Sequence, residues 1–153
     1  MIKNLMKRLG RYRVIMDRQD NEPYLERYYV FLKDRKQFPF NIFIHKFLKG
    51  DPDEPHDHPW SYFTLILWGG YYEYVPYFNE SGKLVNELKR WRGPGHFRFC
   101  QPESYHRIEL KPGVTAWTMF IPGRQQRNWG FWVDDQWIPQ EQYLEKTKEK
   151  SNA

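Results

Sequence analysis

Short segments rich in aromatic and β-branched residues recur along most of this chain, and prolines or glycines separate them. The separators RGPG, QPE and KPG each contain a proline, which cannot donate a hydrogen bond inside a sheet. We expect strands at residues 24–34, 41–49, 60–68, 71–78, 86–92, 96–100, 104–110 and 114–121, with one more within 128–137. Strands this short and this closely spaced predict an all-β fold whose sheets close on themselves and leave few exposed edges.

We expect a short helix at each end of the chain. Residues 1–10 place apolar side chains on one helical face, and residues 139–150 begin with a proline and continue with Glu and Lys at helical spacing. The 153 residues show no compositional break, so the prediction is a single domain with a β-barrel over residues 24–133.

The charge pattern and the cysteine content narrow the classes of function. The net charge of +5 is spread along the chain instead of forming one basic block, and the seven tryptophans fit a barrel core better than a surface that stacks on bases, so nucleic-acid binding is disfavoured. A single cysteine excludes a disulfide within the chain. No apolar stretch approaches the ~20 residues of a membrane span, so we expect a cytoplasmic protein with no membrane association.

The stretch GDPDEPHDHPW places His56 and His58 two residues apart between two prolines. Proline favours an extended conformation in the residue before it, and in an extended chain side chains at i and i+2 leave from the same face. Two imidazoles on one face can converge on one metal ion, with Asp57 pointing the other way. The same alternation places residues 60, 62, 64, 66 and 68 on the histidine face. The alternative is a pair of ordinary histidines in a turn rich in Pro and Asp.

The spacing GxxxxxHxH, followed by a strand and a further glycine at residues 69 and 70, resembles the first motif of the cupin superfamily. The segment GHFRFCQPESYHRIEL resembles the second motif, with Pro102, Ser104 and His106 in order. The resemblance implies a cupin-like double-stranded β-helix, or jelly-roll barrel, with short terminal helices. It also implies a metal bound by His56, His58 and His106.

Many cupins carry a glutamate four or five positions after the second histidine, but Tyr62 and Phe63 stand there in this chain. The pattern therefore favours a three-histidine site, unless Glu73 on the following strand joins as a fourth ligand. Three neutral imidazoles suit Fe(II) that activates dioxygen, as in cupins similar to thiol dioxygenases, and Zn, Ni, Mn or Cu are alternatives.

Tyr62 and Arg98 are the candidate catalytic residues, because an arginine that faces the cavity could hold a carboxylate or a phosphate. Tyr72 or Tyr74 could face the same cavity, whereas Arg107 should point outward by alternation from His106. Two other histidines are undecided: His96 could lie in the cavity or in a turn, and His45 fits the core or a place beside a ligand better than a ligand position.

The function that we expect is a mononuclear Fe(II) dioxygenase of a small polar substrate, in a fold family in which homodimers are frequent. One alternative is a metal-dependent or metal-free isomerase or epimerase of a sugar-like ligand, in which histidine and tyrosine move protons. Another is a non-catalytic ligand-binding or structural cupin.

Overall fold

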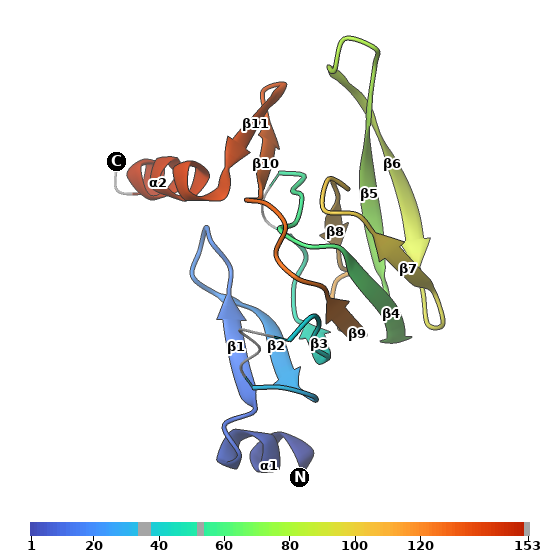
Figure 1. The fold of residues 1–153 in the computed structure, drawn as a ribbon, viewed down its shortest axis with the longest axis vertical. Coiled ribbons are helices and arrows are strands. Elements are labelled where there is room, and N and C mark those ends of the chain that lie inside the picture. The colour runs from blue at the N-terminus through green and yellow to red at the C-terminus, as the bar shows by residue number, and fades with distance from the viewer. Residues whose placement is uncertain (34–37, 52–53, 152–153) are drawn as a thin grey trace.

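Two antiparallel sheets form most of the protein (Figure 1). The computed structural model describes residues 1–33, 38–51 and 54–151, with side chains as far as residue 146. The larger sheet has the order β1-β2-β3-β9-β4-β7, and the smaller sheet has the order β6-β5-β8. The strands of the larger sheet are β1 (Tyr12–Met16), β2 (Pro23–Tyr29), β3 (Phe43–Phe47), β4 (Tyr62–Trp68), β7 (Phe97–Cys100) and β9 (Ala116–Pro122).

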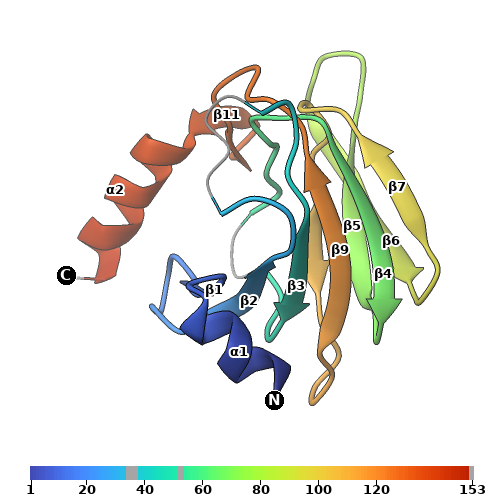
Figure 2. The ribbon, with the colours of Figure 1, turned by 60° about the horizontal axis from the view of Figure 1, so that its bottom comes forward.

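The smaller sheet consists of β5 (Tyr71–Phe78), β6 (Leu84–Arg92) and β8 (Arg107–Glu109). Figure 2 shows β5 and β6 behind β4 and β9 of the larger sheet. A separate hairpin follows, made of β10 (Gly130–Val133) and β11 (Gln136–Pro139). The helices α1 (Ile2–Arg8) and α2 (Gln140–Ser151) lie at the two ends of the chain, as the sequence predicts. The all-β class is confirmed.

A small apolar core joins the two sheets. Ile66 of β4 and Ala116 of β9 pack against Tyr71 of β5 and Ile108 of β8, and all four side chains are buried. Burial of apolar area at about 25 cal/mol per Å² makes such contacts the main force that holds two sheets face to face. A cavity between the sheets, described below, is lined by apolar and aromatic side chains together with several polar and charged ones.

The alternation that we expect along β4 breaks near its end. Tyr62 and Ile66 are buried, but the pairing of β4 with β9 shifts register between Ile66 and Trp68. Trp68 is 71% exposed, so its predicted place on the interior face is wrong. A β-bulge of this kind turns the following side chain out of the alternation.

Two stretches differ from the expected strands. The barrel begins before residue 24, because β1 pairs with β2 along most of its length, from Tyr12 opposite Tyr28 to Met16 opposite Pro23. At the other end, the single strand expected within 128–137 is a hairpin, since Asp134 and Asp135 both have positive φ values, 50° and 59°, and turn the chain. The last residue of the strand expected at 24–34 lies outside the described residues, and β2 ends at Tyr29.

Among the described residues, no helix has the length and apolar character that a membrane span requires. In α1 the expected apolar face is exposed instead of packed, with Ile2 at 72% exposure. A contact between Lys3 and the buried Glu26 of β2 ties α1 to the larger sheet. The predicted first-turn Pro139 closes β11, and α2 begins one residue later.

The tight turn between β4 and β5 provides a stability test. Gly69 and Gly113 have the same φ of +72°, but a Cβ at residue 69 would lie 2.1 Å from the Thr115 carbonyl oxygen, whereas a Cβ at residue 113 would meet nothing within 4 Å. Gly113→Ala should therefore cost only the left-handed backbone penalty of about 1–2 kcal/mol. Gly69→Ala should cost on the order of 3 kcal/mol or more, because the backbone must also move.

Urea unfolding of the two variants beside the wild type measures both costs. Equal losses of stability would show that the close approach of Thr115 does not constrain the turn.

Candidate metal centre

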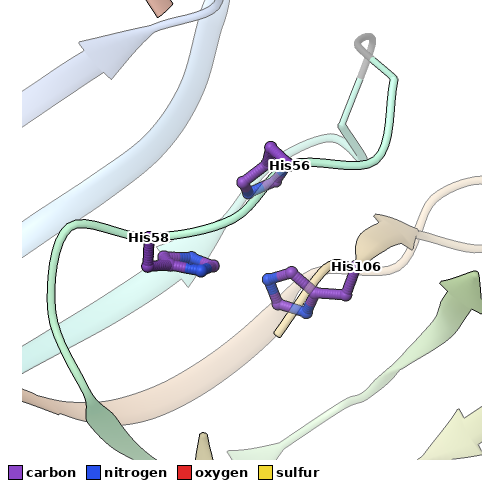
Figure 3. A group of neighbouring side chains, drawn as sticks. All are labelled: His56, His58 and His106. Carbon is purple, nitrogen blue, oxygen red and sulfur yellow. The ribbon is translucent and has the colours of Figure 1, made fainter. Parts of the chain in front are cut away.

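The side chains of three histidines point toward one another (Figure 3), and all three line the cavity. One ring nitrogen from each of His56, His58 and His106 lies within 4.8 Å of the other two. The ring centroid of His56 lies 5.2 Å from that of His58 and 5.2 Å from that of His106, and the His58 and His106 centroids are 5.0 Å apart. The predicted convergence of these three side chains is confirmed.

Backbone hydrogen bonds hold the two histidine segments together. The His56 N–H donates to the His106 carbonyl at 3.0 Å, and the His106 N–H donates back to the His56 carbonyl at 3.1 Å. Neither residue belongs to a longer strand, since this pair forms an isolated antiparallel bridge. The His58 N–H donates to the carbonyl of Pro102 at 3.0 Å. The second motif thus fixes the backbone of the first.

Asp57 anchors the other side of the HxH segment. Its side chain is fully buried and points toward the β10–β11 hairpin, as the alternation predicts. The carboxylate accepts hydrogen bonds from the Gly130 N–H at 2.6 Å and from Trp137 Nε1 at 3.1 Å, and it pairs with Arg127 at 3.0 Å. These contacts hold the backbone between the two histidines from behind.

The imidazoles of His56 and His58 are held in the form that binds metals. Burial, and after it the charge of His106, lowers the pKa of both groups well below the usual value of 6.5. The Nδ1 atoms of His56 and His58 are buried and have no hydrogen-bond partner among the described residues. Neutral imidazole is the ligating form of histidine, so the group fits a divalent cation.

Glu73 of β5 binds the back of the His106 ring. Its Oε1 lies 2.9 Å from His106 Nδ1 and also contacts Arg98, and its Oε2 accepts a hydrogen bond from Arg92 Nε at 2.8 Å. Burial alone would raise the pKa of Glu73, but the hydrogen bond from His106 and the charges of His106 and Arg98 lower it to about 2. Both carboxylate oxygens are engaged, so this geometry makes Glu73 a partner of a ligand and does not bring it in as a fourth ligand.

The two candidate catalytic residues both line the cavity. The Tyr62 hydroxyl lies 3.4 Å from His106 Nε2, and its ring centroid lies 4.5 Å from that of His58. Arg98 lies opposite Thr64 in the pairing of β7 with β4 and is engaged by Glu73. Tyr62 therefore lies beside the rings of His58 and His106, whereas Arg98 contacts the carboxylate that binds His106 Nδ1.

The other polar residues considered from the sequence differ in whether their side chains line the cavity. Tyr72 and Tyr74 do not face the cavity, because Glu73 between them points inward; the Tyr74 hydroxyl donates to Glu109 instead, at 2.6 Å. Arg107 points outward, as expected, and pairs with Glu87 at 2.7 Å. The sequence also left two histidines open, His45 and His96, and both line the cavity outside the three-nitrogen group.

The cavity has a volume of about 310 Å³. Several residues of its wall were not predicted from the sequence, among them Arg18, Arg27, Asp51, Arg92 and Trp129. Arg27 could have been found from its alternation with Leu25 in β2, but no pattern marks Arg18 or Trp129, which reach the cavity from loops.

No family model matches this sequence, and no curated protein sequence matches it. Solved structures do resemble the fold. A cupin-2 domain protein from Rhodospirillum rubrum has a TM-score of 0.57 at 10% identity over 80% of this chain and 75% of its own. The polyketide cyclase RemF from Streptomyces resistomycificus has a TM-score of 0.52 at 16% identity over 67% of this chain and 68% of its own.

The hydroxypropylphosphonic acid epoxidase from S. wedmorenis has a TM-score of 0.52 at 13% identity, covering 74% of this chain. The match spans 56% of the epoxidase chain. An Fe(II) form of HppE, with an alternative substrate, has a TM-score of 0.54 at 14% identity. At sequence identities this low, the structural matches establish similarity of fold alone. The chain has the cupin fold, and a three-histidine group capable of holding a divalent metal lies in its interior.

Proposed function

We propose that this protein is a mononuclear Fe(II) dioxygenase that acts on a small polar substrate. The observation that supports the proposal is the donor set: three imidazoles converge on one cavity, and the nearest carboxylate, Glu73, is engaged by other groups. A cavity of about 310 Å³ suits a small molecule, since it lies at the lower end of the usual range for ligand pockets.

Neutral ligands favour redox chemistry with a directly bound substrate. Three imidazoles leave both charges of a dication uncompensated, and a facial set of three ligands leaves coordination positions open. When bound there, Fe(II) would bind dioxygen and substrate together and mediate electron transfer from the substrate to dioxygen. His56, His58 and His106 would hold the ion.

Tyr62 would orient the reacting group. Its hydroxyl lies 3.4 Å from His106 Nε2, on the side of the ring that faces the other two histidines. A phenol is protonated at neutral pH and can donate one hydrogen bond. We assign Tyr62 the role of hydrogen-bond donor to a polar group of the substrate beside the metal ligands.

Glu73 would act as a positioning residue. Its bond to His106 Nδ1 fixes the tautomer that leaves Nε2 for the metal, and Arg92 and Arg98 fix the carboxylate in turn. In this arrangement Arg98 supports the site through Glu73.

Metal binding should require His106 but not His96, although both line the cavity. His106→Ala removes one of three donors, so metal content measured by mass spectrometry should fall from one equivalent to near zero. The rise in stability with added Fe(II), about 2.7 kcal/mol at ~100 times the dissociation constant, should vanish with it. The control is His96→Ala, because His96 lines the cavity outside the three-nitrogen group and its loss should leave one equivalent bound.

The oxygenase assignment has a separate test. Iron-loaded protein should consume dioxygen in the presence of members of a panel of small polar compounds, and Tyr62→Phe should slow this by about 10²-fold or more, the usual scale for the loss of a positioned hydrogen-bond donor. Stoichiometric zinc with no oxygen consumption across the panel would reject the proposal. Turnover that survives chelation would instead favour the isomerase alternative.

Glu73→Gln should weaken metal binding by about 10–100-fold, the usual effect of losing the partner of a ligating histidine. Competition with a chromogenic chelator measures this affinity. Glu87→Gln is the matched control, since Glu87 makes a similar pair with Arg107 outside the cavity. An affinity that is unchanged in Glu73→Gln would show that the carboxylate does not position His106.

A further inference from the structure

A second polar group lines the same cavity, on strands that carry none of the three clustered histidines. Arg27 of β2 lies directly opposite His45 of β3, and His45 lies opposite Thr118 of β9. All three side chains line the cavity, so they form a polar row across the inner face of the larger sheet. The proposed function assigns no role to this row.

Arg27 makes its contacts with neutral groups. Its Nε donates to His45 Nε2 at 2.9 Å, and its guanidinium lies 4.7 Å from the ring centroid of Phe43. The Tyr29 side chain also interacts with it. No carboxylate pairs with Arg27 among the residues whose side chains the structure describes. Glu26, which precedes Arg27 in β2, is engaged by Lys3, Tyr12 and Tyr28.

The electrostatic surroundings make this arrangement unfavourable for folding. Burial lowers the pKa of Arg27, Tyr29 opposes the shift, and the charge of Arg13 adds to it. Arg13 lies directly opposite Arg27 in the pairing of β1 with β2. Like charges that face each other across strands are destabilising, and a half-buried cation such as Arg27 loses part of its hydration without gaining a counter-ion.

The carboxylates of the cavity wall are committed elsewhere. Glu73 is held by His106, Arg92 and Arg98. Asp17 pairs with Lys49, and Asp51 accepts hydrogen bonds from the Tyr24 hydroxyl and from the Ile108 N–H. The positive charge at Arg27 is therefore available to an anion that enters the cavity.

We infer that Arg27 binds an oxyanion group of the substrate, a carboxylate or a phosphonate, while the rest of the molecule extends toward the three histidines. The inference rests on the proposed function in that both use the same cavity. Nε is bound to His45 and the Tyr29 side chain also bonds the guanidinium, so the donors left for an oxyanion are the remaining Nη N–H groups. The planar guanidinium directs such groups toward the oxygens of a carboxylate or a phosphonate. Arg27 thereby becomes a specificity-determining residue for anionic substrates.

The test is calorimetric titration of the full-length chain with three probe ligands of similar size: butyrate, propylphosphonate and the neutral butyramide. The wild type should bind at least one of the anions about tenfold or more tightly than butyramide, the scale expected for hydrogen bonds to a charged group. The anion that binds tighter tells whether the substrate group is a carboxylate or a phosphonate. The preference should persist after chelation, when no ion at the histidines can attract an anion.

Arg27→Gln should abolish the preference for anions. The matched control is Lys46→Gln, which removes one positive charge from the residue that follows His45 in β3. Lys46 lies over the Trp117 ring and does not line the cavity. Its affinities should stay within about twofold of the wild type, because a hydrogen bond, not net charge, carries the preference. Unchanged anion binding in Arg27→Gln, or equal affinity of the wild type for all three probes, would overturn the inference.

A second measurement applies if Arg27→Gln does not fold. In the wild type, the NMR resonance of the Arg27 Nε–H, identified by its absence in Arg27→Lys, should shift with the preferred anion and not with butyramide. A resonance that moves with neither anion would overturn the inference. Both measurements work on metal-free protein, so the result is independent of whether iron or oxygen is involved.

Discussion

The reciprocal pair of backbone hydrogen bonds between His56 and His106 is the contact on which the site depends. It joins a loop that follows β3 of the larger sheet to the segment that leads into β8 of the smaller sheet, and so brings together histidines from segments that belong to neither sheet. Directly paired residues of an antiparallel bridge carry their side chains on the same face, with their Cβ atoms about 5 Å apart. The observed centroid separation of 5.2 Å between these two rings agrees with that geometry. His58 then completes the group because it lies two residues along the same extended segment.

The surroundings of the three rings act on their orientation and their charge. Asp57 holds the HxH backbone from behind through Gly130, Trp137 and Arg127, and Glu73 holds the His106 ring. Burial keeps the pKa values of His56 and His58 low, so a cation does not compete with protons for them near neutral pH. In this account the carboxylates that in other sites would bind a metal are used to position the histidines, and Arg27 supplies the charge for the substrate.

The sequence allowed the convergence of the three histidines and most strands to be predicted, for identifiable reasons. The HxH spacing and its flanking prolines determine local geometry, and the segment around His106 was found through a motif. The strand at Tyr71–Phe78 was found with its full extent because a glycine pair and an Asn-Glu-Ser-Gly turn bound it. Such signals act on the conformation of the backbone near them, so they can be interpreted without knowledge of the tertiary structure.

What could not be predicted depends on contacts between distant segments. Glu73 was identified as a ligand candidate, but its three partners come from β6, from β7 and from the segment before β8, and they engage both of its oxygens. The strand at Tyr12–Met16 was missed because it follows a basic helix and is stabilised by pairing with β2. The exposure of Trp68 depends on a register shift, and the Asp134–Asp135 turn depends on two residues in left-handed conformations. Tertiary structure decides these features.

The most direct test of the central claim is a crystal structure with anomalous diffraction recorded at the absorption edge of the metal that the purified protein carries. The account predicts a single anomalous peak within about 2.0–2.2 Å of one ring nitrogen each of His56, His58 and His106, with Glu73 in contact with the far side of His106. A peak coordinated by Glu73, or a His106 ring turned away from the other two, would contradict it.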